Sequence, residues 1–186
     1  ACNYPGHHLV NKPWKDCHIS VKASSKERLD LSMAQIAELK KRRLQDYGFH
    51  LEYRTRWSDN DMYDHMNNSV YYFLFDSIVN TYLMTHCKLD PPTSPLIGLV
   101  VHSQCDYLAP VGFPALVDLG LRVKKLGKSS VTYEIGVFER SVEEVKAVGE
   151  SVHVFVDRKS RRPRAEGMTA TMKEQLGSLV DTKAKL

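Results

Sequence analysis

The chain has 186 residues, of which 42% are hydrophobic and 26% are charged, and its formal net charge is +4. This length suits one domain with one hydrophobic core. The small positive excess does not indicate a nucleic-acid-binding protein, and no uncharged apolar run is long enough to span a membrane.

The four cysteines show neither metal-type spacing nor the density of a disulfide scaffold, which favours a reducing compartment. No secretory signal is visible near the start of the sequence. We therefore expect an intracellular protein of the cytoplasm or of an organelle matrix.

Residues 1–48 are predicted to form an irregular N-terminal arm with one short helix. A cap at Asp30 or Ser32 and a closing Gly48 predict a helix that ends near Tyr47. The basic run 40–43 falls in its last turns, where cations complement the helix dipole. A localisation signal or a phosphate-binding patch is the alternative for this run. Zinc binding in the arm is disfavoured by irregular spacing of its candidate ligands, which are Cys2, His7, His8, Cys17 and His18.

After Gly48 the hydrophobic pattern changes from helical to alternating. Apolar residues at every second position from Leu51 to Trp57 predict a strand with one buried face. A helix of about five turns then runs from about Asn67 to Cys87. It is apolar on nearly every side, so we expect it to be wrapped by the rest of the chain.

Four strands are predicted between Pro95 and Asp157, and turns of hairpin length join the last three. We expect these four strands to form an antiparallel meander. One strand, one engulfed helix and a meander predict the α+β class, as a curled antiparallel sheet wrapped around a central helix. The main domain is expected to cover residues 49–175, followed by a C-terminal tail at 176–186.

A polar segment joins the first predicted strand to the central helix. Residues 57–68 contain three carboxylates, a histidine and three amides, and such groups are costly to bury without partners. The start of the helix also offers unpaired N–H groups and a positive dipole end. This combination indicates a site for acyl transfer or hydrolysis.

The segment reads D-x-D-x-x-x-H-x-N-N-x-x-Y-Y, formed by Asp59 to Asp61, His65 to Asn68 and Tyr71 to Tyr72. With the strand, helix and sheet around it, this motif resembles the hotdog fold, and more narrowly the 4-hydroxybenzoyl-CoA thioesterase-like branch. The resemblance covers about residues 49–165. Weaker support comes from Asp106-Tyr107-Leu108 and from the turn at residues 127–130.

The resemblance implies hydrolysis of an acyl-CoA thioester, with Asp61 as the catalytic carboxylate. It also implies that a backbone N–H near Asn68 polarises the thioester carbonyl. The active sites would lie at the subunit interfaces of a homodimer, or of a tetramer built from two dimers. No cofactor is implied, because coenzyme A is part of the substrate.

The chemistry of the residues leaves two roles open for Asp61, direct nucleophile or general base that activates water. His65 either polarises the substrate or only holds the loop. Asn67 and Tyr71 are further candidates for contact with the substrate. For the phosphates of coenzyme A we expect Arg158, Arg161 and Arg162, within a run of five cations at residues 158–164, with Lys124, Lys125 and Lys128 as competing candidates.

A hotdog module that binds or scaffolds acyl-CoA without catalysis is the main alternative, and a hotdog dehydratase is a third. An acyl-carrier-protein thioesterase is disfavoured, because Tyr63 stands where those enzymes have an asparagine. A calcium loop is rejected, because an EF-hand needs a further ligand at Tyr63 and a glycine at Asp64. We expect no metal site.

Overall fold

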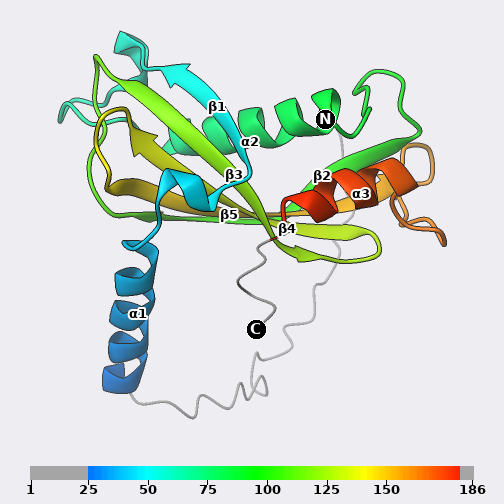
Figure 1. Ribbon diagram of the computed structural model, residues 1–186, viewed down its shortest axis with the longest axis horizontal. Coiled ribbons are helices and arrows are strands. Elements are labelled where there is room, and N and C mark those ends of the chain that lie inside the picture. The colour runs from blue at the N-terminus through cyan, green and yellow to red at the C-terminus, as the bar shows by residue number, and fades with distance from the viewer. Residues whose placement is uncertain (1–24, 181–186) are drawn as a thin grey trace, which may run out of the picture.

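The computed structural model describes residues 25–180 of the chain (Figure 1). The irregular arm before residue 25, the zinc candidates within it and the end of the C-terminal tail lie outside these residues. The elements in chain order are α1 (Ser25–Leu39), η1 (Leu44–Asp46), β1 (Phe49–Arg54), η2 (Trp57–Asp59), α2 (Asn68–Thr85), β2 (Leu96–Tyr107), β3 (Leu116–Leu126), β4 (Ser130–Glu139), β5 (Val145–Asp157) and α3 (Ala170–Ser178).

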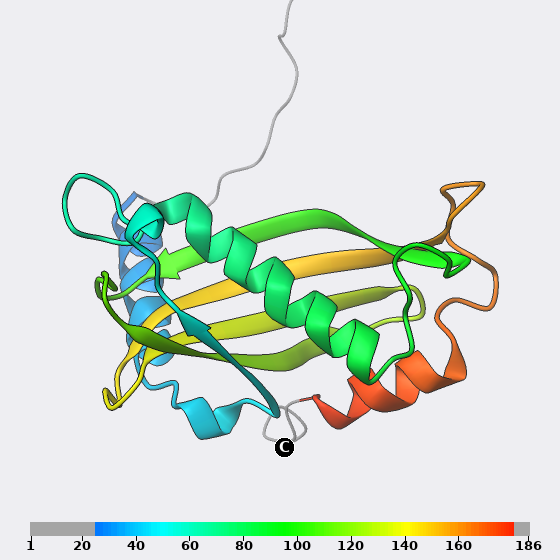
Figure 2. The same cartoon turned by 90° about the horizontal axis from the view of Figure 1, so that it is seen from above.

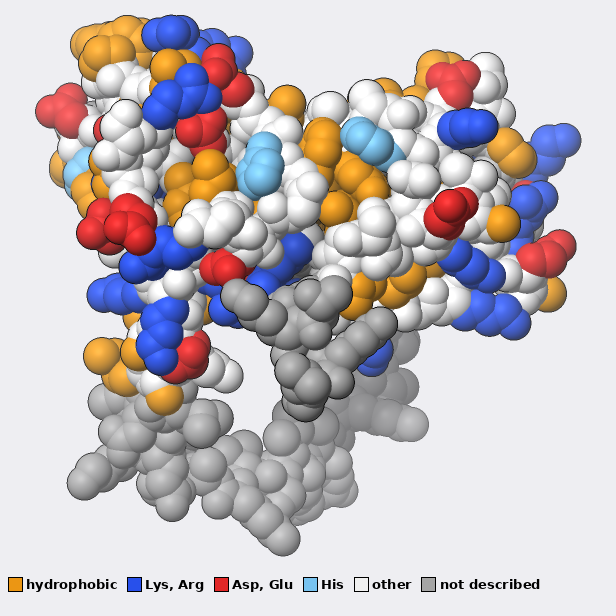
Figure 3. Space-filling model, in the orientation of Figure 1, with side chains coloured by type: hydrophobic (Ala, Val, Ile, Leu, Met, Phe, Trp, Pro, Cys, Tyr) orange, Lys and Arg blue, Asp and Glu red, His pale blue; other side chains and the backbone are white. Residues whose placement is uncertain are grey.

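Five antiparallel strands form one sheet in the order β1-β3-β4-β5-β2. The long helix α2 lies across one face of this sheet, and α3 packs near the end of α2 (Figure 2). On the other side, α1 projects away from the body of the domain (Figures 1 and 3). This arrangement confirms the predicted α+β class and the hotdog architecture.

The predicted four-stranded meander is wrong in one respect, because β2 pairs with β5 and not with β3. Strands β3, β4 and β5 do form consecutive hairpins. The segment between β2 and β3, residues 108–115, is too long and proline-rich for a tight hairpin. It therefore carries the chain past β5 and β4 to β3, and leaves β2 as an edge strand.

The first helix also differs from its prediction. It ends at Leu39, and residues 40–43 leave the helical conformation before the separate turn η1. Arg43 and Tyr47 are both extended, with φ of −126° and −113°. This break lets Arg42 and Tyr47 reach the sheet, which a continuous helix up to Tyr47 would not allow. The predicted boundary at residue 175 falls inside α3.

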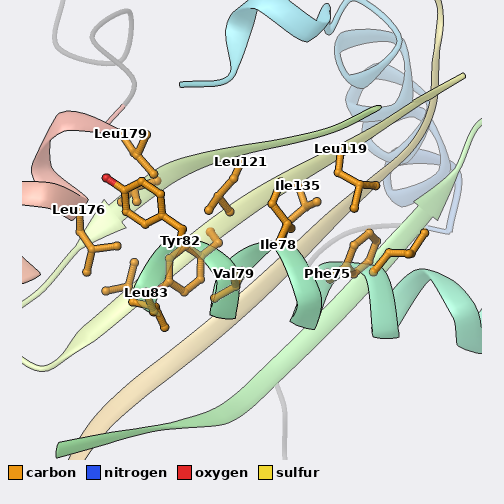
Figure 4. Packing of buried hydrophobic residues seen from close by; sticks show 14 of the residues in the cluster. Phe75, Ile78, Val79, Tyr82, Leu83, Leu119, Leu121, Ile135, Leu176 and Leu179 are labelled. Atoms are coloured by element: carbon orange, nitrogen blue, oxygen red, sulfur yellow. The ribbon is translucent and has the colours of Figure 1, made fainter. Parts of the chain in front are cut away.

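The core lies between α2 and the sheet (Figure 4). Alternate residues of β3 and β4 point towards α2 and are fully buried: Val117, Leu119, Leu121, Val123, Val131, Tyr133, Ile135 and Val137. From α2, Ile78, Val79 and Leu83 pack against them. Each such side chain contributes about 1.5–3 kcal/mol when it leaves water. Within residues 25–180 nothing covers the opposite flank of α2, and Phe73 there is 70% exposed.

On the outer face of the sheet, Tyr47 lies over two glycines. Gly120 of β3 and Gly136 of β4 are direct partners in the strand register. A Cβ atom at Gly120 would lie 2.6 Å from the Tyr47 ring, and one at Gly136 would lie equally close. The Tyr47 ring can therefore lie flat on the sheet only because neither of these two residues has a side chain.

A buried charge cluster lies beside Tyr47. Glu134 Oε1 accepts hydrogen bonds from Arg122 at 2.8 Å, from Arg42 at 2.9 Å and from Tyr47 Oη at 3.2 Å. Burial opposes ionisation of Glu134, but the two guanidinium groups outweigh it and lower its pKa. These contacts fix the chain that leads from α1 into β1 against the sheet.

The packing of Tyr47 on Gly120 predicts that Gly120→Ala changes stability in opposite directions with and without the Tyr47 ring. In the wild type, Gly120→Ala should lower the free energy of unfolding by about 1–3 kcal/mol, because its Cβ would overlap the Tyr47 ring. In a Tyr47→Ala background the same change should be neutral or stabilising, because alanine suits a strand better than glycine. Urea unfolding of the four proteins measures the coupling.

Gly177→Ala is the matched control, because a Cβ at this position in α3 would meet no atom closer than 4.0 Å. This control should be stabilising. An equal loss of stability for Gly120→Ala with and without Tyr47 would mean that overlap with the Tyr47 ring is not the cause of the loss.

Candidate active site

The loop between β1 and α2 is built around a buried carboxylate. Asp59 is 1% exposed and accepts hydrogen bonds from Tyr53 Oη at 2.6 Å and from the Arg56 backbone N–H at 2.7 Å. The Arg56 guanidinium adds an ion pair at 3.0 Å. Burial opposes ionisation, but these partners outweigh it and lower the pKa of Asp59. Asp59 therefore holds the start of the loop in place.

Asp61 has a different environment. One of its oxygens, Oδ1, accepts the backbone N–H groups of Tyr63 at 2.7 Å and His65 at 3.2 Å. Its own N–H donates to the His65 carbonyl at 2.7 Å. Among residues 25–180, no group pairs with the second oxygen, Oδ2. The carboxylate is thus oriented by the backbone and keeps one oxygen for another molecule.

The turn after Asp61 depends on an unusual backbone conformation. Asp64 has φ +60°, in the left-handed region that aspartate tolerates better than most residues. The β2–β3 segment packs on this turn: Met66 donates to the Val111 carbonyl at 2.6 Å. A Cβ atom at Gly112 would lie 2.7 Å from the Asp64 carbonyl oxygen, so this close approach requires glycine.

The first residue of α2 presents a backbone donor. Asn67 caps the helix: its Oδ1 accepts Ser69 N–H at 3.0 Å, and its carbonyl accepts Val70 N–H at 2.9 Å. The N–H of Asn68 has no partner within residues 25–180. Its position at the positive end of an 18-residue helix makes this N–H a donor for an anionic oxygen.

A pocket of about 280 Å³ opens beside this donor. Residues on its wall include His65, Asn68, Tyr71, Tyr107 and Pro110. The rings of Tyr71 and Tyr107 meet edge to face at 5.1 Å, and Tyr107 Oη lies 3.5 Å from the Asn68 carbonyl. Burial raises the pKa of Tyr71 to about 12, so its side chain is a neutral phenol at neutral pH.

The structure thus brings together His65, Asn68 and Tyr71 from the predicted set. Asp61 is hydrogen-bonded to the same loop but does not border this pocket within one chain. The side-chain oxygen of Asn67 is occupied by the helix cap. Tyr107 was not among the predicted site residues; the Asp-Tyr-Leu sequence around it was its signal, but the sequence alone does not place β2 beside the start of α2.

The predicted cationic cluster, residues 158–164, lies at the opposite end of the domain (Figures 2 and 3). It follows β5, whose last residue pairs with the first residue of β2. Arg158 is engaged, because its guanidinium donates to the carbonyls of Ser94, at 2.7 Å, and Pro91. For the exposed side chains of Arg161 and Arg162, no partner is present in the described part of the chain.

Thiolate chemistry does not suit the two cysteines that the structure describes. Burial raises the pKa of Cys105 to about 12 and that of Cys87 to about 11, so both are thiols at neutral pH. Within residues 25–180, no group of three or more histidine, cysteine or acidic side chains is placed to hold a metal ion. These two thiols are therefore poor candidates for the nucleophile.

The chain was compared with known families and structures. Residues 63–146 match the model of the thioesterase superfamily. The PA5185 protein of Pseudomonas aeruginosa is 44% identical to this chain, with a TM-score of 0.72. The match covers 75% of this chain and 96% of PA5185. The chain belongs to the thioesterase superfamily. A comparison with curated proteins found no match.

More distant structures share the fold. A 1,4-dihydroxy-2-naphthoyl-CoA thioesterase from Synechocystis is 12% identical, with a TM-score of 0.63 over 70% of this chain and 96% of its own. A thioesterase superfamily protein from Jannaschia is 19% identical, with a TM-score of 0.65 over 77% of this chain and 88% of its own. None of the helices within residues 25–180 combines the length and apolar character needed to cross a bilayer.

Proposed function

We propose that this protein hydrolyses an acyl-CoA thioester to the free acid and coenzyme A. The observation that carries the proposal is that one segment holds both an oriented carboxylate at Asp61 and, at Asn68, a helix N–H without a partner among residues 25–180. Thioester hydrolysis needs these two functions: a group that attacks or activates water, and a donor that stabilises the oxygen of the tetrahedral state.

The reaction follows from these groups. The Asn68 N–H donates to the thioester oxygen as negative charge develops on it, a contribution typically worth about 3 kcal/mol of barrier. Asp61 either takes a proton from the attacking water or attacks the carbonyl itself to form a mixed anhydride. In both routes the C–S bond breaks and the thiolate of coenzyme A leaves. In the second, water then hydrolyses the anhydride and regenerates Asp61.

His65 and Tyr71 have supporting roles in this proposal. His65 borders the pocket while its backbone N–H orients Asp61, so its ring is available to the thioester oxygen or to water. Tyr71 and Tyr107 form an aromatic wall that shields the carbonyl from solvent. Asn67 contributes through the helix cap that fixes the position of the Asn68 N–H.

We further propose that the active enzyme contains a dimer formed through β2. This strand has 12 residues and, within the described part of the chain, pairs on one side only. It carries exposed apolar side chains at Leu99, Val100 and Val101. A long apolar edge strand needs a partner, and two-fold pairing is the commonest solution. Such a dimer also covers the exposed flank of α2 around Phe73.

In this dimer, the cationic cluster at residues 158–164 of one copy lies near the site of the other copy. Within one chain, the cluster and Asn68 lie at opposite ends of the domain, and α2, which runs between these ends, is about 27 Å long at 1.5 Å per residue. Antiparallel pairing of two β2 strands instead places the end of one, Tyr107, beside the start of the other, Leu96. Because Leu96 pairs with Asp157, the cluster of the second copy then lies near this chain's α2 start. We propose that Arg161 and Arg162 bind coenzyme A phosphates across the interface.

Asp61→Asn is expected to lower kcat by about 10²–10⁴-fold while the protein stays folded, because the amide can neither accept a proton nor act as the nucleophile. A panel of acyl-CoAs from short to long, with aromatic thioesters, identifies the substrate for this test. Asp64→Asn in the same loop is the matched control. Unchanged turnover in folded Asp61→Asn would sink the proposal, and a wild type inactive on every thioester would favour a binding module.

Arg161→Ala combined with Arg162→Ala should raise KM for acyl-CoA and leave kcat nearly intact, because the change removes phosphate contacts remote from the carbonyl. A short thioester that lacks the nucleotide should be hardly affected. Equal losses on both substrates would mean that the loop supports the fold and that the phosphates bind elsewhere.

Hybrid dimers test whether the arginines act across the interface. When the Asp61→Asn protein is mixed with the double arginine variant, each hybrid contains one site with both Asp61 and the arginine pair. Activity at low acyl-CoA concentration should therefore rise above the mean of the two parents. If each chain used its own arginines, no intact site would form and the mixture would show only that mean.

A further inference from the structure

The side chain of Tyr107 stands at the end of β2, on the wall of the pocket that Asn68 also borders. It is 44% exposed, so a molecule in the pocket can contact it. Its Oη lies 3.5 Å from the carbonyl oxygen of Asn68, the residue whose N–H is assigned to the thioester oxygen. A phenol hydroxyl is therefore present beside the proposed backbone donor.

Three contacts hold this hydroxyl in place. The backbone of Tyr107 is paired with Ala147 of β5. Its ring packs edge to face at 5.1 Å on Tyr71, which is only 3% exposed. Its Oη is hydrogen-bonded to the side chain of Cys105, two residues earlier on the same face of β2. A donor fixed in this way does not have to move during a reaction, which is the condition for transition-state stabilisation.

Both partners in the contact between Cys105 and Tyr107 carry a proton at neutral pH. Burial raises the pKa of Cys105 to about 12, so its side chain is a thiol. Partial burial and the neighbouring Cys105 also raise the pKa of Tyr107, so its side chain is a neutral phenol. The thiol can donate its hydrogen to Tyr107 Oη, and the phenol then has its own hydrogen for another acceptor.

The acceptor that the protein offers to the Tyr107 hydroxyl is a weak one. Among residues 25–180, the Asn68 carbonyl is the only oxygen to which this hydroxyl donates, and the distance of 3.5 Å is long for an O–H···O hydrogen bond, which is usually about 2.7–2.8 Å. The same carbonyl also belongs to the hydrogen-bond ladder of α2. An oxygen atom of a ligand in the pocket can therefore replace it as the acceptor.

We propose that Tyr107 is a second hydrogen-bond donor to the thioester oxygen, acting together with the backbone N–H of Asn68. This inference rests on the proposed hydrolysis of acyl-CoA and adds a catalytic residue to it. As the nucleophile adds to the carbonyl carbon, the C=O bond becomes a single bond and its oxygen gains negative charge, which the phenol hydrogen bond stabilises. The carbonyl re-forms when the C–S bond breaks. Tyr107 keeps its proton throughout, so no further acid or base is needed to restore it.

Tyr107→Phe is the direct test, because it removes the hydroxyl and keeps the ring that packs on Tyr71. On the acyl-CoA that the wild type hydrolyses best, kcat should fall about 10²-fold and KM should change by less than about threefold, because the contact strengthens mainly in the transition state. Tyr133→Phe is the matched control. It removes a buried hydroxyl that has no partner among residues 25–180, and it should leave kcat unchanged.

An infrared measurement separates contact with the substrate from support of the fold. A ketone analogue of the acyl-CoA, with a methylene in place of the sulfur, cannot be hydrolysed, and a hydrogen bond to its carbonyl lowers the stretching frequency. This frequency should be higher in Tyr107→Phe than in the wild type, and unchanged in Tyr133→Phe. Cys105→Ala should lower kcat less than Tyr107→Phe does, and should add no loss when the two are combined, because the thiol acts through the phenol.

Melting curves confirm that each tested variant is folded. Unchanged kcat in folded Tyr107→Phe would overturn the inference and leave the proposed hydrolysis standing. A loss of kcat without a change in the carbonyl frequency would also overturn it, because the hydroxyl would then only hold the start of α2 through Asn68. If the wild type hydrolyses no acyl-CoA at all, the proposed function fails, and the inference fails with it.

Discussion

The packing of α2 against the sheet determines the position of the groups that we assign to catalysis. Ile78, Val79 and Leu83 bury one side of the helix on β3 and β4, which fixes its axis and hence the place of its first residue. The helix begins at the rim of the core and not inside it, so the Asn68 N–H reaches solvent while the remainder of the helix is held rigidly. A backbone donor needs this rigidity, because it stabilises a transition state only if it does not have to move.

The loop before α2 is held by polar contacts. Asp59 is satisfied by Tyr53 and Arg56, whereas Asp61, two residues later, keeps one oxygen without a partner among the described residues. Two neighbouring aspartates therefore have different tasks: one is buried and fixes the loop, the other is oriented towards a second molecule. A similar division exists on the sheet, where Glu134 is bonded to Arg42 and Arg122, while Nδ1 of His153 has no partner among residues 25–180.

Much of the fold could be predicted from local pattern. The alternation in β3 and β4, the apolar length of α2 and the polar segment before it depend on residues that are close in sequence. The strand pairing of β2 could not be predicted, because two strands compete for the same edge and only tertiary packing decides between them. The break after Leu39 was missed for a similar reason: the gain comes from Tyr47 and Arg42 contacting β3 and β4, which are distant in sequence.

The candidate site likewise combines features set by residues close in sequence with features set by distant contacts. The motif residues Asp61, His65 and Asn68 are close in sequence, and their shared loop was predictable. The position of Tyr107 beside Asn68 depends on strand order and register. The cationic run at 158–164 is visible in the sequence, but the sequence did not indicate that it would lie at the opposite end of the domain from Asp61 of the same chain.

The most direct test of this account is a comparison of Asn68→Pro with Asn68→Ala, assayed on the acyl-CoA that the enzyme hydrolyses best. Asn68 is the first helical residue, where proline fits well, and Asn67, with φ −59° and ψ 138°, already has a polyproline-type backbone that suits the residue before proline. Proline removes only the backbone N–H that is assigned to the thioester oxygen, whereas alanine keeps it. We expect a folded Asn68→Pro protein with kcat lowered about 10²–10³-fold, and an Asn68→Ala protein close to wild type. Equal kcat values in the two folded variants would contradict the assignment of the α2 N-terminus as the group that stabilises the transition state.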